Sequence, residues 1–315
     1  MSSPRVSVVI PAWNADATLP RTLEAVAAQG LGDPYEVVCV DNGSTDGTAA
    51  ILGDAPEPVR VVRREHGLAG EARNDGVAAA RGEILAFTDA DCFPEPDWLA
   101  AGLEAMERAD LVQGRVRPDP GARMGPFDRS LWVGADDGLY QTANLFLRRS
   151  AFDAIGGFEE MHDDARGRAF GEDVLLAWRA RRAGARPEFC STAVVNHAVL
   201  PRGAAAYVRE RERLGGFAAL AARVPELRRT FLFGRVFLSR RSAEFDAALL
   251  GFAVAAATRS RAPAAAALPY TLRIARRSLE SGAGAPVVAP VEVVADAVGL
   301  AALARGSLRH RSPVL

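Results

Sequence analysis

Five short apolar runs alternate with amphipathic stretches over the first 115 residues, and this alternation limits the folds open to the chain. The runs are rich in Val and Ile and are short enough for strands, whereas the stretches between them have helical spacing. This order is typical of an α/β fold, a mostly parallel sheet flanked by helices. The expected strands are 6–10, 36–41, 59–63, 84–88 and 111–116, and the expected helices are 19–28, 45–52, 70–80 and 97–109.

The pattern changes twice further along the chain. Residues 117–140 are rich in Pro and Gly and lack periodicity, which is typical of a loop that crosses a site. A strand at 142–147 and helices at 150–155 and 172–183 are expected next. After residue 200 the chain becomes Ala- and Arg-rich, with helices broken by prolines. We therefore predict one domain over residues 1–200 and a C-terminal helical appendage over residues 201–315.

Composition limits the class of protein and the cellular compartment that fit this chain. The chain has 315 residues, of which 49% are hydrophobic and 24% charged, as in globular proteins. Its three cysteines form no Cys-x-x-Cys pattern, so a reducing compartment is expected and a structural zinc site is not. The first apolar run is too short for a signal peptide. Residues 247–258 and 283–304 predict no transmembrane helix, because the first is short and the second contains acidic residues and prolines.

Charge is distributed unevenly. Residues 1–200 carry 20 arginines and 31 acidic residues, whereas residues 201–315 carry 18 arginines and 8 acidic residues. The basic C-terminal part fits either a solvated helical surface or attraction to an anionic membrane or to phosphate groups. Because the first part is acidic, nucleic-acid binding is not expected.

Asp89-Ala90-Asp91 follows the apolar run 84–88. Residues i and i+2 of an extended segment face the same side, so both carboxylates can approach one cation. Mg²⁺ and Mn²⁺ prefer such oxygen ligands and leave positions for substrate phosphates. An acidic pair at a strand end is also ordinary loop chemistry, so the interpretation depends on its neighbours.

Polar clusters follow several of the expected strands. Ligands of open α/β sheets bind beyond the carboxyl ends of the strands, which is where these clusters fall. One cluster alone would be turn chemistry, but several at one sheet edge indicate a site. The clusters are Pro11–Asn14, Asp41–Gly47, Gly67–Asn74 and Asp89–Asp91.

Together these motifs resemble the family-two inverting glycosyltransferases of the GT-A fold. The resemblance is carried by Val-Ser-Val-Val-Ile-Pro-Ala-Trp-Asn, Val-Asp-Asn-Gly-Ser-Thr-Asp-Gly-Thr, Ala-Arg-Asn-x-Gly and Asp-Ala-Asp. Further matches lie at 143–149, 155–160 and 171–174. The resemblance covers residues 5–200, and it specifies neither the sugar nor the acceptor.

The resemblance implies a donor pocket and a metal site. Trp13 would stack on the base, Asp41 would bind base or ribose, and Arg73 would contact the diphosphate. The alternatives are a core Trp13, a turn-capping Asp41 and an Arg73 in an exposed salt bridge. A Mn²⁺ or Mg²⁺ ion would be held by Asp91, Asp89 and His197, with Asp89 shared between the metal and the donor's ribose or sugar, although a lone His is often structural. The remaining donor contacts implied are Pro11, Ala12, Asn14, Ala90 and Arg213.

The resemblance also implies the acceptor side. Asp173, with Glu172 beside it, would take the proton of the acceptor hydroxyl. The alternative is that this pair only complements the positive end of a helix. Asn144, Gly156 and Gly157 would lie near the acceptor, or would be scaffold and turn residues.

The predicted function is a metal-dependent, inverting glycosyltransferase with a nucleotide-sugar donor, most simply a UDP-sugar. Processive relatives carry Gln-x-x-Arg-Trp, which residues 207–215 lack, so a non-processive enzyme is expected. The acceptor would be a lipid-linked or cell-envelope glycan. The alternatives are a nucleotidyltransferase of similar fold and a degenerate member that binds nucleotide without turnover. No Gly-x-Gly-x-x-Gly follows a strand, which argues against a dehydrogenase.

The C-terminal helices are predicted to dock on the catalytic domain and to touch the cytoplasmic face of the membrane, making the protein cytoplasmic and peripheral. The arginines expected to meet anionic lipid are Arg259, Arg261, Arg273, Arg276 and Arg277. The alternative is that the apolar helix faces pack against one another or form a dimer.

Overall fold

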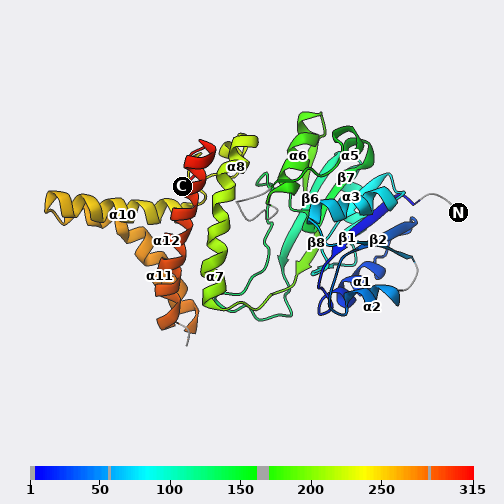
Figure 1. Ribbon diagram of the computed structural model, residues 1–315, viewed down its shortest axis with the longest axis horizontal. Helices are drawn as coiled ribbons and strands as arrows, with labels where there is room; N and C mark the ends of the chain where they lie inside the picture. The colour runs from blue at the N-terminus through cyan, green and yellow to red at the C-terminus, as the bar shows by residue number, and fades with distance from the viewer. Residues whose placement is uncertain (1–3, 56–57, 162–169, 283–284) are drawn as a thin grey trace. The chain divides into compact units, whose positions relative to one another are not determined.

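The computed structural model describes residues 4–55, 58–161, 170–282 and 285–315. The chain forms two compact units, and Figure 1 labels many of their helices and strands. The first unit contains Met1–Arg123, Ser130–Met161 and Gly171–Val199. The second contains Met124–Arg129, His162–Phe170 and Leu200–Leu315.

The first unit is built on an eight-stranded mixed sheet with the order β3-β2-β1-β4-β7-β6-β8-β5. Strands β3, β2, β1 and β4 are parallel, β7 is antiparallel to both of its neighbours, and β5 is antiparallel to β8. The strands are β1 (Val6–Ala12), β2 (Tyr35–Asn42), β3 (Val59–Arg64), β4 (Ile84–Phe87), β5 (Cys92–Pro94), β6 (Leu111–Pro118), β7 (Leu145–Arg148) and β8 (Pro187–His197). The five strands predicted before residue 117 are confirmed.

Among the described residues, six α-helices of the first unit flank this sheet, and the helices predicted from periodicity are confirmed. They are α1 (Leu19–Ala27), α2 (Thr48–Gly53), α3 (Ala69–Ala79), α4 (Trp98–Met106), α5 (Arg149–Ile155) and α6 (Glu172–Arg182). The strand predicted at 142–147 begins instead with a 3-10 turn, η1 (Thr142–Asn144), before β7. Strand β5 was not predicted, because three residues are too few to show a period.

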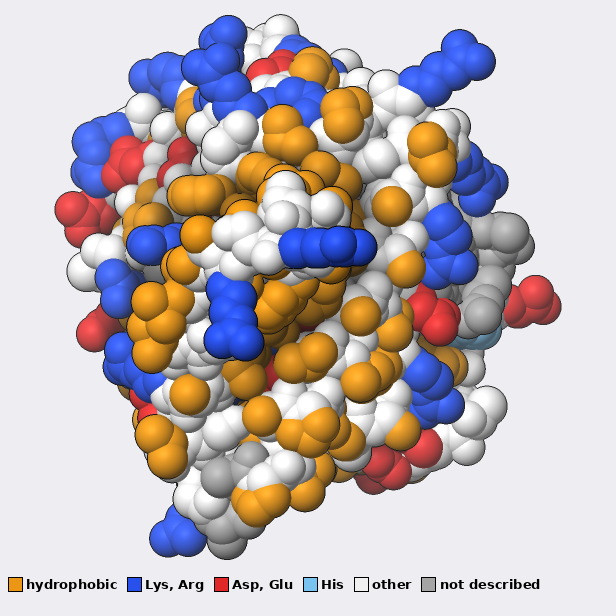
Figure 2. Space-filling view, turned by 90° about the vertical axis from the view of Figure 1, so that its left-hand side faces the viewer, with side chains coloured by type: hydrophobic (Ala, Val, Ile, Leu, Met, Phe, Trp, Pro, Cys, Tyr) orange, Lys and Arg blue, Asp and Glu red, His pale blue; other side chains and the backbone are white. Residues whose placement is uncertain are grey.

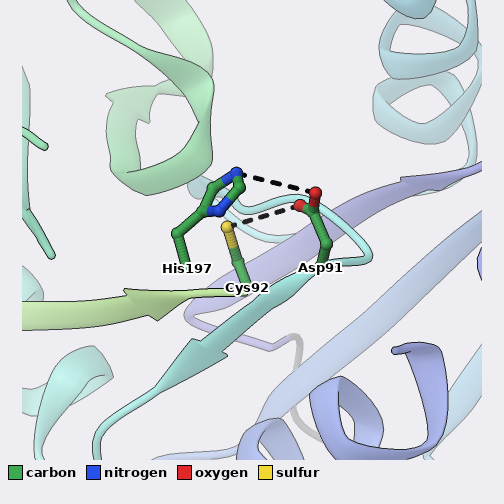
Figure 3. A group of neighbouring side chains, drawn as sticks. All are labelled: Asp91, Cys92 and His197. Atoms are coloured by element: carbon green, nitrogen blue, oxygen red, sulfur yellow. Dashed lines mark hydrogen bonds and ion pairs between the residues drawn. The ribbon is translucent and has the colours of Figure 1, made fainter. Parts of the chain in front are cut away.

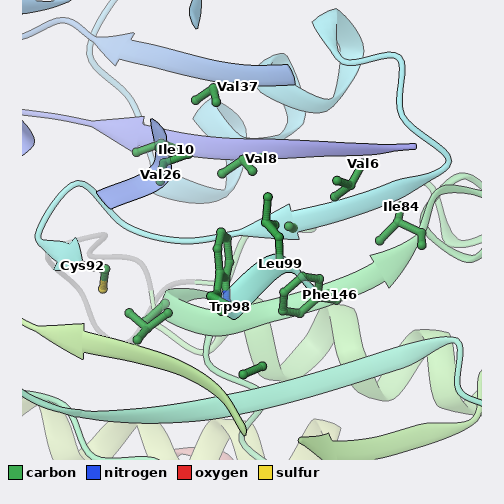
Figure 4. Close-up of a cluster of buried hydrophobic side chains, with 14 of the residues drawn as sticks. Val6, Val8, Ile10, Val26, Val37, Ile84, Cys92, Trp98, Leu99 and Phe146 are labelled. Carbon is green, nitrogen blue, oxygen red and sulfur yellow. The ribbon is translucent and has the colours of Figure 1, made fainter. Parts of the chain in front are cut away.

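The core of this unit follows from strand alternation. Val6, Val8 and Ile10 of β1 lie on one face of the sheet, in the cluster of Figure 4 that includes Val26 of α1 and Trp98 of α4. Val9 lies on the opposite face, beneath α3. There Gly76 lets the helix approach closely, since a Cβ at that position would lie 2.6 Å from the Val9 side chain.

The second unit is helical, as predicted for the region after residue 200. Its elements are α7 (Ala204–Glu210), η2 (Arg211–Gly215), α8 (Gly216–Arg223), α9 (Leu227–Thr230), α10 (Arg240–Thr258), η3 (Ala262–Ala267), α11 (Leu268–Glu280) and α12 (Ala285–His310). One segment of α12, Pro286–His310, is long and apolar enough to cross a membrane by length and composition. This differs from the sequence-based expectation, in which two prolines and two acidic residues counted against a span there.

Candidate active site

Asp91, Cys92 and His197 bring their ligand atoms within 4.8 Å of one another at the β5 end of the sheet (Figure 3). The antiparallel pairing of β5 with β8 places Cys92 opposite His197. The Ala198 amide donates to the Asp91 carbonyl at 2.8 Å, which fixes the two chains at this point. Asp91 Oδ2 consequently lies 3.5 Å from His197 Nε2.

The hydrogen bonds of His197 leave its Nε2 facing Asp91. His197 Nδ1 lies 2.7 Å from the Ala198 carbonyl oxygen, which can only accept, so Nδ1 carries a proton. Ser130 Oγ donates to the His197 carbonyl at 3.3 Å. In the neutral ring, Nε2 is then an electron-pair donor opposite a carboxylate, an arrangement that suits a divalent cation.

Cys92 does not fit as a ligand of such an ion. Its side chain is fully buried, and burial raises the pKa of the Cys92 thiol well above its ordinary value. A protonated thiol is a poor ligand, and Mg²⁺ and Mn²⁺ prefer oxygen ligands to sulfur, while Mn²⁺ also accepts an imidazole nitrogen. The residues present therefore fit a hard cation bound by Asp91 and His197.

Asp89 does not belong to this group of three. Its Oδ1 accepts a hydrogen bond from Arg73 Nη2 at 2.7 Å. Arg73 is only 5% exposed, and its Nη1 lies 3.5 Å from Glu172 Oε1. The geometry therefore gives Arg73 an ion-pairing role, in a buried form and not in the exposed form considered from the sequence. A contact of Arg73 with the diphosphate stays a prediction.

Glu172 and Asp173 begin α6, where acidic groups complement the helix dipole. The Val174 amide donates to Asp173 Oδ1 at 2.8 Å. Loss of hydration, and secondly the Glu172 carboxylate, raise the pKa of Asp173 to about 7. A carboxylate with such a pKa is well matched to accepting a proton near neutral pH.

Trp13 is not a core residue, because its side chain is 52% exposed. Its ring lies 4.6 Å from that of His66, centroid to centroid, at an interplanar angle of 31°. His66 Nδ1 is in turn 3.1 Å from the Asn42 carbonyl oxygen. The sequence analysis missed His66, although its place just after β3 is a signal of the same kind as the other strand-end clusters.

The loops after β1 and β2 are tied together by polar side chains. Asp41 Oδ1 accepts from the Ser44 amide at 3.0 Å, so Asp41 does cap its own turn. Asn14 Oδ1 accepts from the Thr45 amide at 2.8 Å. Both residues thus shape the predicted pocket, and direct donor contacts of Asp41 and Asn14 stay predictions.

Three predicted donor contacts fall at the end of β1 and in the Asp-Ala-Asp turn. Pro11 is half-buried, whereas Ala12 and Ala90 are 1% and 6% exposed. The Ala90 carbonyl accepts from Thr22 Oγ1 at 2.9 Å. The side chains of Ala12 and Ala90 are therefore packing groups, and donor contacts at Pro11, Ala12 and Ala90 stay predictions.

Asn144 is a scaffold residue, and the expectation of an acceptor contact is corrected by its burial. It is 0% exposed, its Oδ1 accepts from Trp98 Nε1 at 2.8 Å, and its Nδ2 donates to the Arg115 and Ala193 carbonyls. The register of β6 and β8 shifts between Gly114 and Arg115. The Asn144 side-chain amide occupies this bulge, and its hydrogen bonds take the place of the backbone hydrogen bonds that the bulge interrupts.

Gly156 and Gly157 form a left-handed turn after α5, with φ of 73° and 77°. A Cβ on Gly157 would lie 2.7 Å from Asn74 Oδ1, which accepts from the Phe158 amide at 2.9 Å. The turn alternative therefore explains both glycines, and an acceptor contact stays a prediction. Arg213 lies in η2 of the second unit, and its predicted donor contact also stays a prediction.

The mixed sheet, with candidate ligands at its strand ends, defines a nucleotide-sugar glycosyltransferase of the GT-A fold. The sequence profile described as glycosyl transferase family 2 matches residues 7–159. Glycosyltransferase AglE of Haloferax volcanii is 31% identical over 215 residues, which cover 64% of this chain and 69% of AglE. The chain belongs to glycosyl transferase family 2.

Other similar proteins extend the comparison. The pre-mycofactocin glycosyltransferase of Mycobacterium tuberculosis is 31% identical over 215 residues, covering 61% of this chain and 42% of that protein. The mannosyltransferase PcManGT from Pyrobaculum calidifontis, in complex with GDP-Man and Mn²⁺, matches with a TM-score of 0.63 and 22% identity over 97% of this chain and 88% of that one. S. aureus TarS 1–349, in complex with UDP-GlcNAc, matches with a TM-score of 0.51 and 16% identity over 98% and 92%. At these identities the structural likenesses show the fold alone.

Proposed function

We propose that this protein is a metal-dependent, inverting and non-processive glycosyltransferase, in which the first unit carries the chemistry. The observation that carries the proposal is the convergence of Asp91 and His197 at one end of the sheet, with Nε2 and Oδ2 3.5 Å apart. Arg73 links Asp89 to Glu172, so the metal side and the base side share one buried cation.

Each residue of the candidate site has a separate role in the proposed transfer. Asp91 and His197 would hold Mn²⁺ or Mg²⁺, with Asp89 beside them, and the ion supplies neutralisation of the leaving nucleoside diphosphate. Trp13 offers its exposed ring to the base of the donor. Asp173 accepts the proton of the attacking hydroxyl, while Glu172 helps to raise its pKa. Attack by that hydroxyl on the face opposite the leaving group inverts the anomeric centre.

The donor is proposed to be a UDP-sugar, with a GDP-sugar as the alternative. Similar structures are complexes with UDP-GlcNAc and with GDP-Man and Mn²⁺, so relatives of this fold accept either nucleotide. The acceptor is proposed to be a lipid-linked or cell-envelope glycan, because the second unit is basic and exposes apolar side chains. That composition also supports a peripheral location on the cytoplasmic membrane face.

The experiment is thermal unfolding in the presence of UDP, GDP, dTDP or CDP, with and without Mn²⁺. A ligand at about 100 times its Kd adds roughly 2.7 kcal/mol to the stability of the folded state. We expect one nucleotide to stabilise the protein only with Mn²⁺, and Asp91→Ala to abolish the effect. Asp153→Ala is the matched control, because Asp153 is exposed on α5. No shift for any nucleotide would contradict the proposal.

A second measurement separates transfer from mere binding. Hydrolysis of the stabilising nucleotide's sugar conjugate, followed as release of nucleoside diphosphate, needs no knowledge of the acceptor. We expect slow metal-dependent release by the wild type and a loss of at least 100-fold in Asp173→Asn, the usual contribution of a general base. Binding without any release would favour the degenerate family member instead.

A further inference from the structure

Exposed hydrophobic side chains are concentrated on the last helices of the second unit. Of the 15 large exposed hydrophobic residues in the described chain, 11 lie on α10, α11 and α12. Figure 2 faces the side of the Figure 1 view on which α10 is drawn, and there hydrophobic side chains lie next to one another with arginines among them. Single exposed apolar residues are common on soluble proteins, but a concentration of this kind marks an interaction surface.

Helix α10 has no polar side chain between Ala247 and Ala257, over about three turns. One side of it packs on η3, where a Cβ on Gly251 would lie 2.6 Å from the Pro263 carbonyl oxygen. The other side is exposed and equally apolar. Its large side chains Leu249, Leu250, Phe252 and Val254 are 45%, 66%, 54% and 39% exposed.

Helix α11 presents a second apolar stripe. Leu268, Leu272 and Leu279 lie at positions i, i+4 and i+11, which share one face, and they are 58%, 60% and 79% exposed. The opposite face holds Tyr270 and Ile274, which are buried in a cluster with α10. The two helices and η3 form a hairpin, residues 240–280, whose exposed surface carries both apolar stripes next to charged side chains such as Arg276.

The charged residues in the middle of the hairpin are all positive. Between Asp246 and Glu280 the chain has five arginines and no acidic residue. Three of the five are engaged within the unit: Arg273 with Glu244 at 2.6 Å, Arg276 with Glu280 at 2.8 Å, and Arg277 with Glu292 and the Pro126 carbonyl. Contact of all five arginines with lipid stays a prediction.

Arg259 and Arg261 remain, and they lie at the turn of the hairpin. Both are exposed, and no carboxylate in the described chain pairs with either of them. Two cations beside an apolar stripe complement an anionic lipid surface, where each contributes about 1 kcal/mol, or roughly a fivefold change in affinity. A second copy of the chain fits less well, because a symmetric dimer through this surface would bring like charges together.

Helix α12 has the length of a membrane span, but two of its acidic side chains are paired within the second unit. Glu292, in the first third of α12, is 0% exposed and accepts from Tyr207 Oη at 2.8 Å as well as from Arg241. Asp296, one turn on, accepts from Tyr270 Oη at 2.7 Å. Extracting α12 into a bilayer would strand these paired groups in hydrocarbon, where each unsatisfied group costs several kcal/mol.

We infer that the α10–α11 hairpin is the membrane-docking element of this protein. It lies in the plane of an anionic lipid surface, with its leucines among the acyl chains and Arg259 and Arg261 at the headgroups, while α12 stays inside the second unit. This deepens the proposed peripheral location by naming the surface, and it rests on that part of the proposed function.

The test is flotation of the full chain with vesicles of phosphatidylcholine, or of phosphatidylcholine and phosphatidylglycerol in equal parts. We expect the wild type to float with the anionic vesicles at low salt and to lose binding as salt is raised. Arg259→Gln combined with Arg261→Gln should weaken binding by about 25-fold, at fivefold for each arginine. Leu250→Asp combined with Leu272→Asp should remove it.

Matched controls keep the test specific. Arg63→Gln removes an exposed arginine of β3 in the first unit, and Leu308→Asp charges an apolar residue of α12 that is 82% exposed. Both should float as the wild type does, and circular dichroism checks that every variant is folded. The inference is overturned if the wild type stays in the soluble fraction, or if a control loses binding as strongly as the hairpin variants do.

The result of the flotation test can be distinguished from the result of the test of the proposed activity. Nucleotide-dependent thermal stabilisation is measured on the same preparations. A protein that binds nucleotide with Mn²⁺ but does not float overturns the docking inference alone. A protein that floats but responds to no nucleotide supports the docking inference and contradicts the proposed transferase site. A concentration-dependent dimer that the hairpin variants abolish, without flotation, would make a second copy the occupant.

Discussion

Arg73 connects the two halves of the candidate site, because its Nη2 donates to Asp89 at 2.7 Å and its Nη1 lies 3.5 Å from Glu172. Asp89 precedes the proposed metal ligand by two residues, and Glu172 precedes the proposed base by one. The buried Arg73 guanidinium therefore positions one carboxylate near the proposed metal ligand and another beside the proposed base. The Arg73 charge also compensates the negative charge of three acidic residues near it, Asp89, Glu172 and Asp173.

Replacement of Arg73 tests this positioning role. We expect Arg73→Met to lower the free energy of unfolding by about 2–3 kcal/mol, less than the 3–5 kcal/mol typical of a fully buried pair because the Asp89 side chain is 31% exposed. Arg73→Lys keeps the charge but can reach only one partner, so an intermediate loss is expected. Urea denaturation measures both. A Lys variant of unchanged stability but weakened nucleotide binding would favour direct contact with the diphosphate instead.

The raised pKa of Asp173 predicts the pH dependence of turnover. A protonated Asp173 cannot accept the acceptor's proton, so the rate should fall as the pH drops through about 7. The measurement is kcat/KM for donor hydrolysis between pH 5 and pH 9. A profile that is flat down to pH 5 would show that the base is another group.

The same pKa has a consequence for stability, with a definite sign. An acid whose pKa rises from about 4 in the unfolded chain to about 7 in the folded protein loses stability as the pH rises through that window. Asp173→Asn removes this loss. The unliganded variant should therefore be more stable than the wild type at pH 8 and equally stable near pH 4, as measured by denaturation at both values.

His197 is predicted to be a metal ligand. His197→Ala should weaken the affinity for the nucleotide in the presence of Mn²⁺ by at least tenfold, because the ion would lose a coordinating atom opposite Asp91. Ser130→Ala, which touches only the hydrogen bonds around the imidazole, should have a smaller effect. If Mn²⁺ dependence is unchanged in His197→Ala, the histidine is structural.

Much of the fold could be predicted from the sequence because the early strands carry strong local signals. Val6–Ala12 and its parallel neighbours are apolar runs of strand length, and their ends hold the polar clusters. The β5–β8 pairing could not be predicted in this way. Strand β5 has three residues, and the first half of β8 alternates poorly. Only the resemblance suggested that His197 would lie near Asp91.

The functional roles of buried polar residues were harder to infer. Arg73 was expected at the donor and Asn144 at the acceptor, since each falls within a motif. Their burial depends on long-range packing that a linear pattern does not record: Arg73 meets a residue 16 positions away, and Asn144 meets Ala193, 49 positions away. In the same way, three of the five arginines expected at the membrane form ion pairs within the second unit, which the sequence did not predict.

Trp13 is predicted to bind the base by stacking. Stacking on an aromatic side chain contributes about 1–3 kcal/mol per base, so Trp13→Ala should raise the nucleotide Kd by about 5- to 150-fold. Trp13→Phe should retain part of the affinity. Because Trp13 is half exposed, the unfolding free energy should change little. Calorimetric titration with the stabilising nucleotide measures the Kd, and unchanged affinity in Trp13→Ala would exclude stacking.

Asn144 provides the sharpest separation of a structural role from an acceptor role. Asn144→Ala leaves Trp98 Nε1 and the carbonyls of Arg115 and Ala193 without their partners at the β6–β8 bulge. Each unsatisfied buried group costs about 1–3 kcal/mol, and water entering the vacated space offsets part of it, so a loss of roughly 2–4 kcal/mol is expected. Asn144→Asp should be at least as damaging, because it replaces the donating amide with a buried acceptor facing two carbonyls. Urea denaturation measures the loss, and at temperatures where the variants are folded their nucleotide affinity should match the wild type. A variant of wild-type stability would contradict the scaffold role and restore the acceptor contact.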